Sequence, residues 1–289
     1  MQIREALAQA IETLRNQEVE SPRLDAELLM AHVLQTNRAA LLTWPERELT
    51  PKQLTSFRDQ VARRAAREPL AYIVGHREFF GLDLAVDSRV LIPRPETELL
   101  VERAVEIARG LQKQPKIADV GAGSGAIAVS VAVHLPGAVV YALDSSAEAL
   151  TVVAANAHRH GVADRVCCLQ GDLLNPLPEP VDVVVANLPY VTTEEWKALP
   201  PEIRVHEPRA ALDGGPDGLA YIRRLFEAAY QYLQPGGTIL AEIGANQGAA
   251  VTSLAGKTCP DAQVTLCQDL AGLDRMIAVR RQGSAIPCV

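Results

Sequence analysis

Long uninterrupted apolar stretches are missing from this sequence, although 48% of its 289 residues are hydrophobic. A membrane-spanning helix needs about 20 consecutive apolar residues, so we expect no transmembrane segment. The opening stretch MQIREALAQAIETLRN carries acidic residues in its first turns and has no continuous apolar centre, so we expect it not to be a secretory signal peptide. We therefore expect a cytoplasmic protein without a membrane partner.

Cysteine is scarce, with five residues, of which Cys288 is the last, and no CxxC spacing. An odd number without paired spacing argues against a disulfide framework and a zinc ribbon, and it is typical of a reducing compartment. His158 and His160 lie two apart on a predicted helix and so point to different faces. We expect no metal site.

Positive charge is under-represented in the larger, C-terminal part of the chain. Residues 1–95 hold 13 basic and 13 acidic residues, whereas the remainder holds 15 and 22, and this remainder carries the whole net charge of −7. Phosphate contacts supply most non-specific affinity for nucleic acids, and the chain has no basic arm interleaved with aromatic residues. We therefore expect no direct nucleic-acid partner.

The N-terminal part of the chain carries helical patterns. Ser21 followed by Pro22 predicts a capped helix start, and the TPKQ pattern from Thr50 predicts a capping box. Pro69 is expected to end the helix that begins there. The signals predict a small all-helical bundle over residues 1–74.

A β-hairpin linker is expected over residues 75–95, because REFFGLDLAV contains two β-prone runs around a turn. Over residues 96–289, helices alternate with seven strand candidates: KIADVG, AVVYALD, RVCCLQGD, VDVVVAN, GTILAEIG, AQVTLCQD and RMIAVRR. The first four are continuous apolar runs, typical of parallel strands covered on both faces. The last two suit an antiparallel pair at one edge. The pattern predicts a doubly wound α/β domain with a mostly parallel sheet and a ligand at the carboxyl ends of its strands.

The segment ADVGAGSGAIAVSVA leaves the first of these strands and enters a helix with a GxGxG spacing. This spacing suits a nicotinamide dinucleotide, S-adenosylmethionine or a simple packing turn. Asp119, just before the glycines, favours S-adenosylmethionine, because an acid suits a cationic amino-acid end and opposes a pyrophosphate. Asp144, at the end of the second strand, is expected to accept hydrogen bonds from ribose hydroxyls. Asp172 is expected to accept from an adenine amino group while Leu173 packs on the ring, although a turn aspartate remains the alternative.

The fourth strand ends at the tetrapeptide Asn187-Leu188-Pro189-Tyr190. An NH2 group on a planar amide or on adenine is a weak nucleophile, because its lone pair is delocalised. The Asn187 side-chain oxygen and the Leu188 carbonyl can hold its two hydrogens and stabilise the developing positive charge. Pro189 stiffens the loop, and Tyr190 offers a flat face for stacking. The residues alone leave the acceptor open between an amide and adenine.

These glycine-loop, Asp144, Asp172 and Asn187 to Tyr190 motifs resemble those of class I S-adenosylmethionine-dependent amino-methyltransferases. The stretches SPRLDAELLMAHVL, REPLAYIVGHREFFGLDLAVDSRVLIPRPETELL and HEPRAALDGGPDGLAYIRRL are similar to the protein-(glutamine-N5) methyltransferases of peptide-chain release factors, the HemK/PrmC family. The resemblance covers nearly the whole chain and implies a Rossmann-like class I fold. It also assigns cofactor-binding roles to Asp119, Gly121, Ala122, Gly123, Ser124, Gly125, Asp144, Asp172, Leu173 and Asn187.

The resemblance implies transfer of a methyl group from S-adenosylmethionine, leaving S-adenosylhomocysteine, to the glutamine of the Gly-Gly-Gln motif in class I release factors. Such methylation tunes translation termination. The N-terminal bundle is expected to bind the factor. Three alternatives stay open: an N6-adenine methyltransferase on DNA or RNA, a glutamine methyltransferase acting on a ribosomal protein, and a scaffold that docks on a release factor without turnover.

The same resemblance assigns roles to residues whose spacing alone says little. Asn187, Leu188, Pro189 and Tyr190 are the implied catalytic and substrate-binding residues, with Arg94 and Glu96 at the substrate entrance. Glu207, Arg209 and Asp213 are implied to close over the substrate. The family's usual tetrapeptide is Asn-Pro-Pro-Tyr, so Leu188 is a departure that keeps the carbonyl acceptor and reduces rigidity.

Four arginines, Arg58, Arg63, Arg64 and Arg67, cluster on the last predicted helix of the bundle. They suggest either a solvated face or, as a hypothesis, a surface that contacts the release factor.

Overall fold

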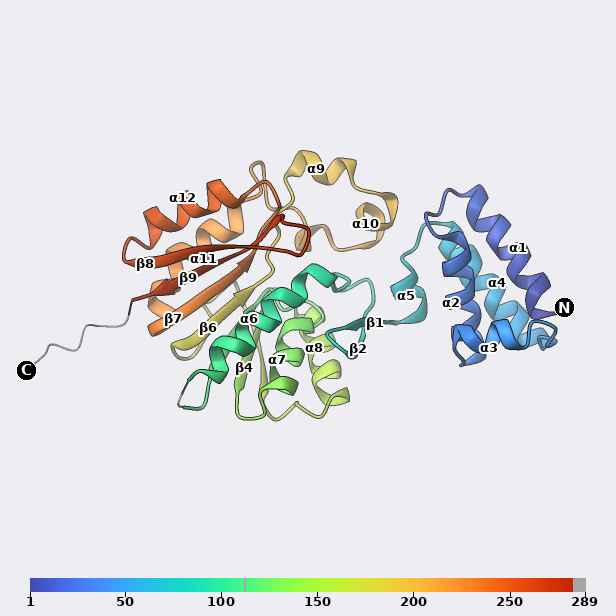
Figure 1. The fold of residues 1–289 in the computed structure, drawn as a ribbon, viewed down its shortest axis with the longest axis horizontal. Helices are drawn as coiled ribbons and strands as arrows, with labels where there is room; N and C mark the ends of the chain where they lie inside the picture. The colour runs from blue at the N-terminus through green and yellow to red at the C-terminus, as the bar shows by residue number, and fades with distance from the viewer. Residues whose placement is uncertain (112, 283–289) are drawn as a thin grey trace, which may run out of the picture. The chain divides into compact units, whose positions relative to one another are not determined.

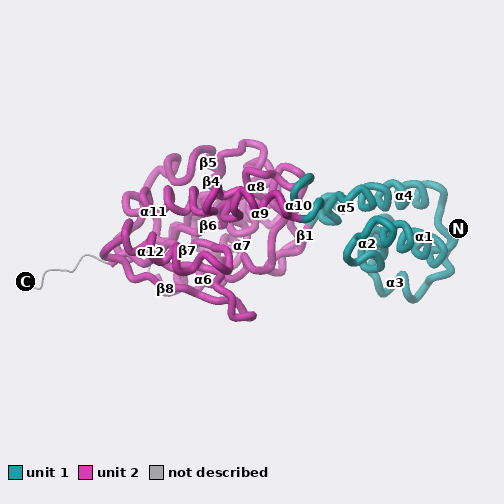
Figure 2. Tube along the Cα trace, turned by 90° about the horizontal axis from the view of Figure 1, so that it is seen from above, with its two compact units in different colours: residues 1–76, 200–206 teal, residues 77–199, 207–289 magenta. Residues whose placement is uncertain are grey.

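The computed structural model describes residues 1–111 and 113–282, so that Cys288 lies outside the described residues. The chain forms two compact units, coloured separately in Figure 2: unit 1 holds residues 1–76 and 200–206, and unit 2 holds residues 77–199 and 207 onward. The sequence did not predict that residues 200–206 would group with the helical unit. Among the described residues, no helix is long and apolar enough to cross a bilayer.

Unit 1 is all-helical (Figures 1 and 2). Its helices are α1 (Ile3–Asn16), α2 (Pro22–Leu34), α3 (Arg38–Thr43), α4 (Pro51–Ala65), α5 (Leu70–Val74) and, from the second segment, α10 (Pro201–His206). Helices α1, α2 and α4 pack around a core that includes Ile3, Leu14, Leu29 and Phe57, each at most 2% exposed. Helical periodicity has therefore placed one apolar face of each helix in a shared interior.

Two local predictions for this unit need correction. The capping box at Thr50 is present, but Ser21 occupies its N-cap position without a side-chain cap hydrogen bond. Helix α4 ends at Ala65, ahead of Pro69, which instead precedes α5. Arg67 at φ +69° turns the chain in between, which explains why the helix stops before the proline.

The four predicted arginines do not form one uniform exposed face: Arg58 and Arg63 are exposed, whereas Arg64 is buried and Arg67 follows the end of α4. Arg64 is buried and donates through Nε to Asp25 Oδ2 at 2.7 Å, with Glu202 Oε1 of α10 at 3.2 Å from its Nη2. Arg67 also pairs with Glu202, and Arg63 pairs with Glu68. Arg64 and Arg67 therefore connect distant segments of unit 1, while the Arg63 pair is local and its arginine is exposed.

The predicted hairpin is formed by β1 (His76–Phe79) and β2 (Leu82–Ala85), and unit 2 begins at Arg77, the second residue of β1. The 3-10 turn η1 (Pro95–Thr97) and α6 (Glu98–Arg109) follow. The seven predicted strands are all present: β3 (Lys116–Val120), β4 (Val139–Asp144), β5 (Val166–Gln170), β6 (Val181–Ala186), β7 (Leu233–Glu242), β8 (Ala262–Gln268) and β9 (Asp274–Arg281). The other elements are α7 (Ala126–His134), α8 (Ala147–Arg159), α9 (Thr193–Ala198), η2 (Arg209–Ala211), α11 (Ala220–Tyr232) and α12 (Gly248–Thr258).

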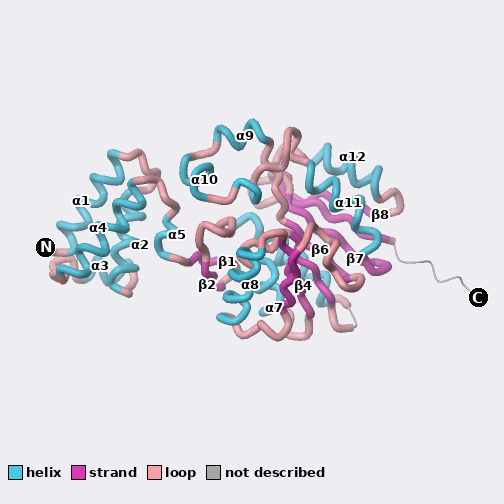
Figure 3. Tube along the Cα trace, turned by 180° about the vertical axis from the view of Figure 1, so that it is seen from behind, coloured by secondary structure: helices cyan, strands magenta, loops and turns pink. Residues whose placement is uncertain are grey.

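The sheet has the order β5-β4-β3-β6-β7-β9-β8. Figures 1 and 3 show this sheet, with β4, β6, β7 and β8 labelled in both. Strands β3 to β7 are parallel, whereas β9 pairs antiparallel with both β7 and β8. The predicted mostly parallel sheet is confirmed. Strand order reverses at β3, which lies between β4 and β6, and ligands of doubly wound folds bind at the carboxyl ends of the strands at such a switch point.

Alternate side chains of the central strands enter two separate apolar cores. Val183 and Val185 of β6 pack in one core with α6, α7 and α8, while Val184 and Ala186 pack in the other with α11 and α12. The strand is buried on both faces, which is why it reads as a continuous apolar run. A sheet that is covered on both faces in this way positions the strand ends that form the site.

Candidate active site

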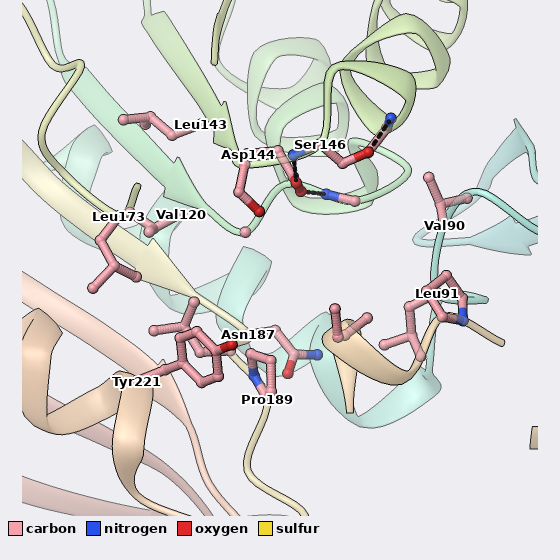
Figure 4. A pocket seen from close by; sticks show the side chains of 18 of the residues that line it. Val90, Leu91, Val120, Leu143, Asp144, Ser146, Leu173, Asn187, Pro189 and Tyr221 are labelled. Carbon is pink, nitrogen blue, oxygen red and sulfur yellow. Dashed lines mark hydrogen bonds between the residues drawn. The ribbon is translucent and has the colours of Figure 1, made fainter. Parts of the chain in front are cut away.

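A cleft opens at the carboxyl ends of β3, β4, β5 and β6 (Figure 4). From the predicted set, it is lined by Gly121, Gly123, Asp144, Asp172, Leu173, Asn187, Leu188 and Pro189. Asp119, Ala122, Ser124, Gly125, Tyr190, Arg94 and Glu96 are not part of this lining. The structure thus brings together four strand-end motifs that are far apart in the sequence.

The glycine loop has the backbone conformation that only glycine adopts easily. Gly121, Gly123 and Gly125 have φ values of +76°, +54° and +78°. A Cβ on Gly125 would lie 3.0 Å from Val153 Cγ1 of α8, and one on Gly121 would lie 3.2 Å from Leu188 Cδ2. The GxGxG spacing therefore serves both the turn and the close approach of the loop to α8 and to the tetrapeptide.

Asp144 connects β4 to this loop. Its Oδ2 accepts a hydrogen bond from the Gly123 N–H at 2.9 Å, and its Oδ1 accepts one from the Ser146 N–H at 2.9 Å (Figure 4). The carboxylate is half-buried and lines the cleft, where its remaining lone pairs can accept from a ligand.

The β5 end turns sharply after Gly171. A Cβ there would lie 2.9 Å from Pro176 Cγ, and Leu173 takes the left-handed φ of +48°, which is strained for a branched side chain. The strained turn presents Leu173 to the cleft. The exposed Asp172 carboxylate forms an ion pair with Arg224 of α11, so part of its hydrogen-bonding capacity is already used.

The tetrapeptide is anchored at both ends. Leu188 is 7% exposed and packs in the core beside α11, so its side chain is accommodated where the family usually has proline. The Asn187 Nδ2 donates to Thr97 Oγ1 at 2.9 Å. Tyr190 lies outside the cleft lining, and its hydroxyl donates to Glu242 Oε1 at 3.1 Å.

Asp119 lies behind the loop rather than in the cleft. It is 1% exposed, and its Oδ2 accepts from the Ala128 N–H at 2.9 Å near the start of α7. Its Oδ1 has no hydrogen-bond partner in the described part of the chain. Burial raises the pKa of this carboxyl to about 7.

Of the two residues that the resemblance placed at the entrance, Arg94 pairs with Glu207, which the resemblance placed in the closing loop. Glu207 is 5% exposed and accepts from the Arg94 guanidinium at 2.5 Å and from the Ile92 N–H at 3.1 Å. Glu96 is exposed.

A second ion pair, between Arg209 and Asp213 at 2.7 Å, lies on the loop that follows the tetrapeptide. The hydrogen bonds from Arg209 hold the pKa of Asp213 below its usual value, with Thr193 and the Gly215 N–H acting in the same direction. The Arg209 guanidinium also stacks over the Trp196 ring, 4.1 Å from its centroid.

Sequence reasoning missed part of the lining: Arg89, Val90, Leu91, Ser145, Ser146, Ala149, Pro208, Ala210, Ala211 and Tyr221. Ser146 could have been found, because a serine just after the β4 aspartate and before a helix is a typical N-cap, and its Oγ accepts from Ala149 N at 3.1 Å. The segments around Val90 and Tyr221 carry no such local signal, since only the folded chain brings them to the cleft (Figure 4).

Comparison with known proteins places both parts of the chain. Residues 5–75 match the family described as the PrmC N-terminal domain, and residues 95–257 match the methyltransferase small domain. A solved methyltransferase from Pyrococcus furiosus has a TM-score of 0.52 at 16% identity, covering 78% of this chain and 98% of that one. This likeness shows the class I methyltransferase fold.

Two relatives are similar over almost their full lengths. The release factor glutamine methyltransferase of Moorella thermoacetica is 45% identical over 98% of this chain and 100% of its own. The protein of the same description from Geobacter sulfurreducens is 42% identical over 91% of this chain and 90% of its own. Identity at this level and coverage, on a chain that carries the glycine loop and the Asn187 tetrapeptide in one cleft, shows that the protein belongs to the release factor glutamine methyltransferase family.

Proposed function

We propose that this protein transfers a methyl group from S-adenosylmethionine to the side-chain amide nitrogen, N5, of the glutamine in the Gly-Gly-Gln motif of class I peptide-chain release factors. The products are N5-methylglutamine, S-adenosylhomocysteine and a proton. The observation that carries the proposal is that Asn187, Leu188 and Pro189 line the same cleft as the glycine loop and Asp144. The proposal places the protein in the cytoplasm, where translation ends.

The residues of the cleft fit S-adenosylmethionine. Gly121 and Gly123 leave the space that a Cβ would fill, Asp144 offers carboxylate lone pairs for ribose hydroxyls, and Leu173, Leu188 and Tyr221 supply apolar surface for a flat base. Bound there, the cofactor supplies a methyl group on a positively charged sulfur. Because Asp119 is buried behind the loop, we assign it to shaping the loop rather than to direct contact.

The protein's own groups make a weak nucleophile react by positioning it. The Asn187 Oδ1 and the Leu188 carbonyl oxygen accept the two amide hydrogens of the substrate glutamine, which aims its nitrogen lone pair. As the new N–C bond forms and the S–C bond breaks, positive charge grows on that nitrogen, and both oxygens stabilise it. The nitrogen then loses one of its protons to solvent.

The helical unit is the proposed binding module for the release factor, with residues 1–74 as its main segment. This assignment rests on the match of residues 5–75 to the PrmC N-terminal domain. Arg64 has no direct role in it, because its side chain is buried in ion pairs within the unit.

The test is methyl transfer from labelled S-adenosylmethionine to three substrates in parallel: a purified class I release factor, the same factor with the motif glutamine changed to alanine, and duplex DNA. We expect label on the intact factor alone. Label on DNA would instead establish an adenine methyltransferase, and label on both factors would move the acceptor to another residue.

Asn187→Ala distinguishes an enzyme from a non-catalytic scaffold. We expect transfer to fall at least about 100-fold, because the amide holder is lost, while cofactor affinity measured by calorimetry changes little. A matched control is Asn175→Ala, which lies outside the cleft lining. If the protein were a scaffold, the starting protein, Asn187→Ala and Asn175→Ala would all bind the factor equally well, and none would transfer label.

A further inference from the structure

A buried carboxylate connects the two ends of the Asn187 tetrapeptide. Thr97 Oγ1 donates to Glu242 Oε2 at 2.7 Å and accepts from Asn187 Nδ2 at 2.9 Å, while the Tyr190 hydroxyl donates to Glu242 Oε1 at 3.1 Å. Thr97 and Glu242 are 4% and 3% exposed, and neither lines the cleft. The chain of contacts runs from η1 through the end of β7 to both ends of the tetrapeptide.

These hydrogen bonds determine which way the Asn187 side-chain amide is oriented. Both carboxyl oxygens of Glu242 accept hydrogen bonds, one from Thr97 and one from Tyr190, so the single hydroxyl proton of Thr97 is directed to Glu242. The Thr97 oxygen is then left as an acceptor for Asn187, which must offer its NH2 group. An amide whose nitrogen faces Thr97 presents its oxygen on the opposite side, and this oxygen is the atom that a substrate NH2 requires.

The Thr97 side chain does not cap a helix. Thr97 has helical backbone angles, with φ −68° and ψ −17°, because η1 runs directly into α6, and its side chain makes no cap hydrogen bond to that helix. The hydroxyl is committed instead to Glu242 and Asn187, which links it to the site rather than to the helix.

The buried charge is costly unless it is well paired. Burial raises the pKa of the Glu242 carboxyl, while the hydrogen bonds from Thr97 and Tyr190 and the cation of Arg275 act in the opposite direction. Burial and the neighbouring Glu242 charge raise the pKa of Tyr190, so its hydroxyl stays protonated and remains a donor.

We propose that Thr97 and Glu242 are positioning residues, which orient the Asn187 amide and the Tyr190 ring so that the tetrapeptide is preset to hold the substrate NH2. This inference rests on the proposed function and adds to it the groups that set the holder's geometry. Neither residue is assigned a contact with substrate or cofactor.

The test compares Thr97→Val, which keeps the shape but removes the hydroxyl, with Thr97→Ser, which keeps the hydroxyl. Thr238→Val is the matched control, because Thr238 is also buried, at 4% exposed, on β7 but away from the tetrapeptide. We expect Thr97→Val to lower kcat for the release factor about 10- to 100-fold. Its cofactor Kd should stay within about twofold of the starting protein. Thr97→Ser should recover most of the rate, and Glu242→Gln, with one acceptor fewer, should resemble Thr97→Val.

A second readout does not depend on turnover. The side-chain NH2 protons of Asn187, assigned by their loss in Asn187→Ala, should shift and exchange faster with solvent in Thr97→Val but not in Thr238→Val. If methyl transfer were absent even in the starting protein, the proposed function would fail while this spectrum still tested the orientation. An unchanged Asn187 signal, or a kcat in folded Thr97→Val equal to that of the Thr238→Val control, would overturn the inference.

Discussion

The Gly123 N–H donates to Asp144 Oδ2 at 2.9 Å, so the carboxylate at the end of β4 fixes the glycine loop that follows β3. Asp144→Ala removes both this contact and the proposed ribose acceptor, and a hydrogen bond to a charged group contributes about 1.5 to 3 kcal/mol. We expect the Kd for S-adenosylmethionine to rise about 10- to 100-fold, measured by calorimetry. Glu148→Ala on the exposed side of α8 is the control, and equal affinity in the two variants would contradict the assignment.

Replacing Gly125 or Gly256 by alanine tests whether the glycine loop requires its left-handed backbone conformation. Gly125 has φ +78°, and a Cβ there would lie 3.0 Å from Val153 Cγ1, whereas Gly256 lies exposed inside α12 with nothing within 4 Å of its Cβ position. We expect Gly125→Ala to lower the free energy of unfolding by about 1 to 3 kcal/mol. Gly256→Ala should raise it by up to about 1 kcal/mol, because alanine favours a helix. Urea unfolding measures both, and opposite signs are the expected result.

Asp119 is expected to make the free energy of unfolding fall as the pH rises. The carboxyl ionises at a pH of about 7 in the folded chain but near 3.8 when unfolded, so the folded state binds more protons between these values. Its contribution to stability is fully present below pH 3.8 and is lost as the pH rises through about 7. Between these limits, the decrease in unfolding free energy should be smaller in Asp119→Asn by a few kcal/mol.

Chemical unfolding at pH 4.5, near the lower end of this window, and at pH 7.5, just above its upper end, measures most of that difference. Asp164→Asn is the control, because the Asp164 side chain is 77% exposed. A pH dependence that is the same in Asp119→Asn as in the starting protein would show that another group dominates.

The pair Arg64–Asp25 is buried inside unit 1, with the side chains 8% and 10% exposed. Arg64→Ala leaves the Asp25 carboxylate buried without its partner, so we expect a loss of about 3 to 5 kcal/mol in the stability of this unit. Arg4→Ala breaks an exposed pair with Glu46, and it should cost less than about 1 kcal/mol. Denaturation of the full chain followed by circular dichroism compares them, and equal costs would refute a structural role for the buried pair.

The strands of the sheet could be predicted because each is marked by a pattern within its own short stretch of sequence. Strands buried on both faces, such as β3 and β6, are continuous apolar runs, and the residues at their ends stand out as polar or glycine. Asp144 and Asn187 could be selected in this way, since each directly ends or follows an apolar strand. The fold type then placed them at one edge without further information.

Contacts between distant segments could not be predicted in this way. Thr97 stands between Glu96 and Glu98 in a charged stretch, and its partner Glu242 is 145 residues away, so no local pattern marks the pair as buried. Arg64 is a different case. It follows Phe57 by seven positions and Val61 by three, so helical periodicity placed it on the apolar stripe, but its charge suggested an exposed face.

The grouping of residues 200–206 with unit 1 means that the chain crosses between the units three times, after His76, after Leu199 and after His206. Neither unit is therefore a single stretch of gene sequence. A helical domain exchanged between relatives at residue 76 alone would leave behind the α10 segment whose Glu202 pairs with Arg64 and Arg67. The module that can be inherited or transplanted intact is discontinuous, and substitutions in α4 and α10 are expected to be correlated across relatives even though the two segments are encoded far apart.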